Sequence, residues 1–84
     1  SNDGLPTMFI NKKELENGIT AAQLFVRAGL CHSGKEAKRL ITEGGAKIND
    51  ATIQEPSKIF FKIDMVEELK LSAGKKRHSL VKVE

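Results

Sequence analysis

The sequence predicts an α+β domain in which two short packed helices are followed by a small twisted antiparallel sheet. Between Thr20 and Gly45, apolar residues recur every three or four positions, which is typical of helices. After Gly45 the apolar residues alternate with a period of two, which is typical of strands. The length of 84 residues allows one small domain. The order of helices first and strands afterwards favours antiparallel pairing.

The N-terminal residues 1–9 are expected to form a linker or a disordered end, because the first seven are mostly polar. The domain is therefore expected to span residues 10–84. Its first element is a helix of one or two turns, because Asn11–Glu14 has the spacing of a helix start and Gly18 that of a stop.

The first of the two packed helices is expected to begin after Thr20. Thr20 and Gln23 have the spacing of a capping box, in which each side chain accepts the other residue's backbone N–H. Gly29 is the expected left-handed stop, and Leu30 can fold back onto Phe25 in a Schellman arrangement.

The second packed helix is expected to begin after Ser33, which forms another capping-box pattern with Glu36, and to end at Gly44 and Gly45. Its apolar stripe consists of Ala37, Leu40 and Ile41. At 100° per residue, the opposite face carries Lys35, Lys38, Arg39 and Thr42.

Several short strands are expected after this helix. Asn49 and Asp50 form a candidate turn, around which Ala46, Ile48 and Ile53 face inward. Beyond Pro56, a second strand with alternating inward residues is predicted at Ile59, Phe61 and Ile63. The remaining alternations are at Leu69 and Leu71, and near the C-terminus around Leu80 to Val83.

Two clusters of positive charge are the candidate functional feature. The chain has 14 Lys and Arg against 11 Asp and Glu, so the net charge of +3 is weak evidence compared with its placement. One cluster is the face of the second helix, where like charges at three- and four-residue spacing destabilise a helix. The other is Lys75, Lys76 and Arg77 beside His78. Both clusters suit a polyanion, although solvated, solubilising charge would give the same pattern.

Other classes of function have little support. The sequence contains no phosphate loop, nucleophile elbow or other catalytic motif, and no apolar stretch of membrane-spanning length. Cys31 is the single cysteine, and with His32 and His78 it gives too few ligands for a zinc site. The chain has four Phe and no Tyr or Trp, which leaves few rings for a base-stacking platform, so a structured RNA recognised by shape is favoured.

The stretch from Thr20 to about Ile53 resembles the RNA-binding motif named for ribosomal protein S-four. The resemblance rests on Gly29-Leu30, Ser33, Ala37, Leu40-Ile41, Gly44-Gly45 and Ile48-Asn49. This motif implies an S-four-like (alpha-L) fold. It also occurs in RNA-modifying and ribosome-associated proteins, such as pseudouridine synthases, so a module of that kind is an alternative.

The sequence is also similar to the C-terminal domain of the bacterial-type tyrosyl-tRNA synthetase family, in the run Gly44 to Asn49, in the tail Leu71 to His78 and in a short final strand. The resemblance implies a non-catalytic appendage that holds tRNA(Tyr), without metal or cofactor, while an ATP-dependent tyrosine–tRNA ligase activity belongs to another domain. It implies a homodimeric parent, a monomeric fragment and a bacterial cytoplasm, with the mitochondrial matrix as the alternative. The implied RNA-binding residues are Ser33, Lys35, Lys38, Arg39, Lys75, Lys76 and Arg77. Gly34 departs from the family, in which an arginine often follows the serine.

A third interpretation, independent of the resemblance, is a protein-interaction domain whose basic faces are only solvated. It predicts no tRNA binding near physiological salt.

Overall fold

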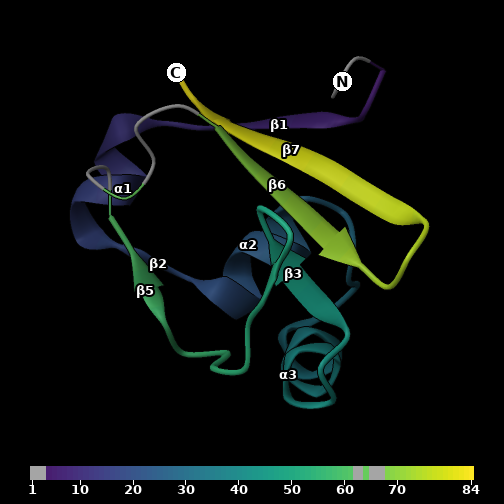
Figure 1. Cartoon of the computed structure of the whole chain (residues 1–84). Helices are drawn as coiled ribbons and strands as arrows, with labels where there is room; N and C mark the ends of the chain where they lie inside the picture. Colours follow the sequence, from purple (N-terminus) through teal and green to yellow (C-terminus); the bar gives the residue numbers. More distant parts are fainter. Residues whose placement is uncertain (1–3, 62–63, 65–67) are drawn as a thin grey trace.

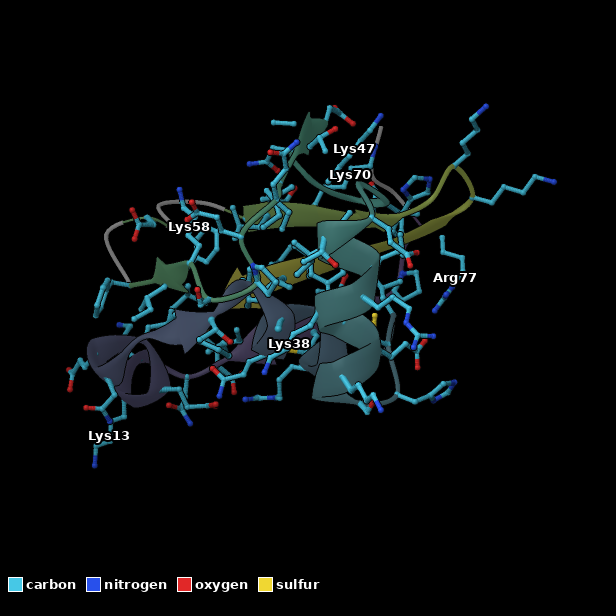
Figure 2. The ribbon with its side chains drawn as sticks, turned by 90° about the horizontal axis from the view of Figure 1, so that it is seen from below. Lys13, Lys38, Lys47, Lys58, Lys70 and Arg77 are labelled. Atoms are coloured by element: carbon cyan, nitrogen blue, oxygen red, sulfur yellow. The ribbon has the colours of Figure 1, made fainter. Side chains whose placement is uncertain are left out.

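In the part of the chain that the computed structural model describes, three helices lie on one side of a five-stranded sheet (Figures 1 and 2). The structure describes residues 4–61, 64 and 68–84. In chain order the elements are β1 (Thr7–Ile10), α1 (Lys12–Asn17), β2 (Ile19–Thr20), α2 (Ala21–Arg27), α3 (Gly34–Thr42), β3 (Ala46–Ile48), β4 (Ala51–Thr52), β5 (Ile59–Phe60), β6 (Glu68–Ala73) and β7 (Arg77–Val83). The predicted α+β class is confirmed.

The main sheet is mixed, whereas the sequence predicts an antiparallel one. Its strand order is β1-β7-β6-β3-β4, and β2 and β5 form a separate two-stranded sheet. Among the strand pairs of the described residues, β1 with β7 is parallel, with Thr7 opposite Leu80, and the others are antiparallel. Residues 7–9, expected in the N-terminal linker, therefore belong to the sheet. The short apolar run Met8–Ile10 gave no indication of its distant partner strand.

Helix α2 has the ends that its sequence predicts. The Thr20 hydroxyl accepts the Gln23 N–H at 3.1 Å, and the side-chain oxygen Oε1 of Gln23 accepts the Thr20 N–H at 2.8 Å. Gly29 has φ +78°, a conformation that a glycine adopts without steric cost. The Leu30 N–H then donates to the Phe25 carbonyl at 3.0 Å, which completes the Schellman motif.

Helix α3 begins with only half of the expected capping box. The Ser33 hydroxyl accepts the Glu36 N–H at 3.1 Å, but the Glu36 carboxylate accepts the N–H of His32 at 3.1 Å, one residue earlier than predicted. Ala37 and Ile41 are fully buried, so the expected apolar stripe faces the core, with Leu40 partly buried beside it. The expected cationic face is therefore exposed.

The β3–β4 hairpin follows its prediction closely. Asn49 and Asp50 both have positive φ, at 50° and 68°, as a two-residue type I′ turn requires. Ala46 and Ile48 are buried, and Ile53 packs partly buried against the core.

The predicted inward face of the next strand is wrong by one residue. In β5, Phe60 is 7% exposed and lies opposite Ile19, whereas Ile59 and Phe61 are 50% and 43% exposed. The core position predicted for Phe61 is thus occupied by its neighbour. Ile59 and Phe61 instead cover Gly18, where an added Cβ would collide with Ile59. The predicted inward position of Ile63 lies outside the described residues.

Candidate nucleic-acid interface

Helix α3 presents its three cations to solvent. Lys35, Lys38 and Arg39 are exposed, and in the described part of the chain no carboxylate lies within 4.0 Å of any of them. Other cations are neutralised locally: Lys70 pairs with Asp50 at 3.6 Å and Lys82 with Glu68 at 3.6 Å. The free positive charge of α3 is therefore a property of this face and not of every lysine on the surface.

The cations of α3 divide between two sides of the helix. Lys38 lines a groove against α2, and Arg39 lines a smaller hollow on the side of β7. Figure 2 shows Lys38 and Arg77 on either side of α3. A polyanion that contacts both sides must therefore wrap across the exposed face of the helix.

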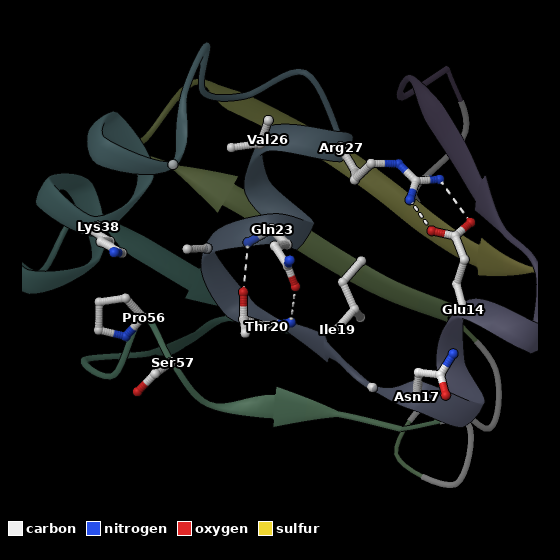
Figure 3. A pocket seen from close by; sticks show the side chains of 13 residues that line it. Glu14, Asn17, Ile19, Thr20, Gln23, Val26, Arg27, Lys38, Pro56 and Ser57 are labelled. Carbon is white, nitrogen blue, oxygen red and sulfur yellow. Dashed lines mark hydrogen bonds and ion pairs between the residues drawn. The ribbon is translucent and has the colours of Figure 1, made fainter.

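The larger depression, which we call the α2–α3 groove, has a volume of about 910 Å³ (Figure 3). Its lining consists of Glu14, Asn17, Gly18, Ile19, Thr20, Ala22, Gln23, Val26, Arg27, Gly34, Lys38, Pro56 and Ser57. An added Cβ at Gly34 would meet nothing within 4 Å, so the absence of an arginine there leaves open space at the N-terminus of α3.

An ion pair between Glu14 of α1 and Arg27 of α2 lies along the α2–α3 groove. The Arg27 guanidinium binds both oxygens of the Glu14 carboxylate, one of them at 3.3 Å. Mainly through this hydrogen bonding, the pKa of Glu14 is lowered and that of Arg27 is raised. The positive charge of Arg27 is consequently engaged within the protein.

The smaller depression, the Arg77 hollow, joins the two basic clusters. It is lined by Leu30, Cys31, Glu36, Arg39, Leu40, Glu43 and Arg77. The Arg77 guanidinium donates to the Leu30 carbonyl at the α2–α3 corner. The fold thus brings residues from the tail and from α3 to one place, which sequence reasoning left open. Because an arginine has five N–H groups, this contact leaves donors for another ligand.

The turn between β6 and β7 carries the other two tail cations. Lys75 and Lys76 are exposed, and neither has a carboxylate within 4.0 Å among the residues that the structure describes. At the start of the turn, the Gly74 N–H donates to the Gly45 carbonyl at 2.9 Å, just beyond α3. The turn is therefore fixed to the C-terminal end of α3.

Ser33 has a more limited role than its sequence suggests. Its hydroxyl already accepts the Glu36 N–H, and the Glu36 carboxylate itself lies at the N-terminus of α3, bound to the His32 N–H. This carboxylate already supplies the negative charge that favours a helix N-terminus. A phosphate contact by Ser33 would therefore use its hydroxyl hydrogen or its backbone N–H.

Cys31 is a buried thiol beneath the Arg77 hollow. Burial raises its pKa, and the carboxylate of Glu36 raises it further, while the nearby Arg77 lowers it. The thiol is therefore kept protonated, in agreement with a packing role at the helix corner.

Sequence reasoning missed a contact between Ser72 and His78. These residues face each other across β6 and β7, and the Ser72 hydroxyl lies 2.8 Å from the His78 Nδ1 atom. The other ring nitrogen, Nε2, lies 3.0 Å from the Lys75 carbonyl in the basic turn. The spacing of the two residues around a short turn at Gly74 was the available signal.

The helix pair, the β3–β4 hairpin and the sheet behind them define an α+β domain of the S-four-like class, and none of the helices described is long and apolar enough to cross a bilayer. No family model matches the chain. The chain is 44% identical over 81 residues to a tyrosine–tRNA ligase of Roseobacter denitrificans. It is 47% identical over 81 residues to that of Ruegeria pomeroyi, and 46% identical over 85 residues to that of Rickettsia africae.

These alignments include 96%, 96% and 98% of this chain, but only 20%, 19% and 20% of the respective ligases. The chain thus spans about a fifth of the length of the curated relatives it matches. The chain is therefore a homologue of one domain-sized part of tyrosine–tRNA ligases, which confirms the resemblance.

Proposed function

We propose that this chain is the tRNA-binding C-terminal domain of a tyrosine–tRNA ligase, which holds tRNA(Tyr) by phosphate contacts and by shape. The observation that carries the proposal is the exposed set of cations on α3 and on the β6–β7 turn, joined by the contact of Arg77 with Leu30. Phosphate contacts supply most of the sequence-independent affinity of nucleic-acid-binding proteins.

The proposed contacts are Lys35, Lys38, Arg39, Lys75, Lys76 and Arg77, with Ser33 at the helix start. Helix α3 provides the central contact, and the tethered turn extends it beyond the Arg77 hollow. Phe25 and Phe60 are buried, so only Phe9 and Phe61 of the four phenylalanines are exposed to bases. The proposed mode is therefore recognition of a folded RNA through the positions of its phosphates.

In the proposed parent enzyme this domain performs no chemistry. ATP-dependent activation of tyrosine and its transfer to tRNA take place on another domain of a homodimeric, cytoplasmic enzyme. The domain contributes binding energy and orients the tRNA so that its acceptor end can reach that site. The fragment itself is proposed to be a monomer.

The proposal is tested by titrating a fluorescently labelled tRNA(Tyr) transcript with the 84-residue chain at several salt concentrations. Neutralising about four to six phosphates gives a slope of log K against log salt of about −3 to −5. A flat salt response, or no binding near physiological salt, would contradict the proposal and favour a protein-interaction domain. Single-stranded RNA of the same length serves as the matched control, and it should bind more weakly if the folded shape of the RNA is recognised.

A further inference from the structure

His78 has two hydrogen bonds that together determine the orientation of its ring. The Lys75 carbonyl can only accept, so the His78 Nε2 atom, 3.0 Å away, must carry a hydrogen. In the neutral ring, Nδ1 is then an acceptor, and it receives the Ser72 hydroxyl hydrogen at 2.8 Å. Ser72 is only 2% exposed, so without this contact its hydroxyl would lack a partner in a nearly dry place.

The Lys75 carbonyl lies in the middle of the loop formed by residues 74–76. Two adjacent lysines repel each other there, and Gly74 has φ +72°. The start of the loop is fixed by the bond from Gly74 to Gly45, and its end by the bond from Arg77 to Leu30. His78 supplies the contact that fixes the middle, because its ring reaches back from β7 to the loop backbone.

We propose that His78, oriented by Ser72, is a positioning residue that holds Lys75 and Lys76 in place for RNA. This inference rests on the proposed function and adds a residue that does not itself need to touch the RNA. A loop already held in its bound conformation loses less conformational entropy on binding. The two hydrogen bonds of His78, to Ser72 and to the Lys75 carbonyl, therefore raise RNA affinity by holding the two lysines in place.

Two conservative variants separate the contacts of the ring. In His78→Gln the side-chain amide nitrogen lies near the place of Nε2 and can still donate to the Lys75 carbonyl. In His78→Asn the shorter amide occupies the place of Nδ1, so it can reach Ser72 but not the loop. We expect His78→Asn to bind tRNA(Tyr) about three- to tenfold more weakly than His78→Gln, which is the effect of the lost donor to the Lys75 carbonyl. His78→Gln itself should bind somewhat more weakly than the original chain, because it keeps that donor but loses the Ser72 contact.

The double variant Lys75→Ala with Lys76→Ala tests whether His78 acts through the lysines. In that background, His78→Asn should cause no further loss of affinity, because the groups that His78 positions are gone. Backbone ¹⁵N relaxation of the free chain should also show greater ps–ns motion at residues 75 and 76 in His78→Asn than in His78→Gln. Thermal unfolding of each variant establishes that it is folded.

Equal affinities of His78→Asn and His78→Gln would overturn the positioning role. So would an undiminished effect of His78→Asn in the double-alanine background, since that result indicates a general structural effect. If the original chain binds tRNA with a steep salt dependence while these outcomes occur, the proposed function stands and only the inference fails. If the original chain does not bind tRNA at all, both fail, even where the relaxation data show the loop to be held by His78.

Discussion

Replacing Lys75 and Lys76 together by alanine gives the sharpest test of the tail cluster. Six cations are proposed to contact phosphates: Lys35, Lys38, Arg39, Lys75, Lys76 and Arg77. At about −0.9 per neutralised phosphate, six contacts give a salt slope of about −5, and four give about −3.6. We take the original chain and the double variant to bind tRNA with equal affinity near 1 M salt. Because their slopes differ by about 1.8, the affinity of the variant at 0.1 M salt is then about 60-fold lower.

The matched control is Lys12→Ala with Lys13→Ala, which removes the same charge from α1. Both control lysines are exposed, and Lys13 lies at the opposite end of the molecule from Arg77 (Figure 2). Fluorescence anisotropy with labelled tRNA(Tyr), from 0.05 to 0.5 M salt, should give the reduced slope for the tail variant only. Equal losses for the two double variants would refute the reasoning, because net charge alone would then explain the binding.

Three further predictions concern the fold. Phe60→Ala should lower the free energy of unfolding by about 3–5 kcal/mol in urea titrations, and Phe61→Ala by much less, because only Phe60 is buried; equal losses would contradict the assignment. Gly29→Ala should lower the free energy of unfolding by about 1 kcal/mol in the same assay, because alanine is strained at the Gly29 φ of +78°. An unchanged free energy of unfolding would contradict this reason for the glycine. Since Arg27 lowers the pKa of Glu14 from its ordinary 4.5, the pair stabilises the fold above that pH, and the contribution is lost as the pH falls through the lowered value. In urea titrations at several pH values, the original chain should have a higher free energy of unfolding than Glu14→Gln, and this difference should shrink in acid. A difference that stays constant with pH would exclude the ion pair as its cause.

The parts of the fold predictable from sequence are those determined by nearby residues. The capping box of Thr20 with Gln23, the left-handed Gly29 and the Asn49–Asp50 turn all depend on contacts within a few positions, and each is present. The prediction of which β5 residues face inward was wrong, because residues 59–61 are all apolar and either alternation fits the sequence. Only the pairing of Ile19 with Phe60 decides between them.

The candidate site was predictable in its residue types but not in its arrangement. Helical periodicity indicates that Lys38 and Arg39 are exposed, yet it cannot show that they line different depressions, because the packing of α2 and β7 beside α3 decides this. Likewise, the bond from Arg77 to the Leu30 carbonyl joins residues 47 positions apart. The parallel pairing of β1 with β7 has the same cause, a partner that is remote in sequence.

The central claim is that α3 and the β6–β7 turn together form one RNA-binding face. It is tested most directly by adding unlabelled tRNA(Tyr) to the ¹⁵N-labelled chain and recording which backbone amide signals shift or broaden. If both elements contact the RNA, the largest signal changes are expected in residues 33–39 and 74–77, with little change in α1. Changes concentrated in α1, or spread evenly over the whole surface, would contradict it.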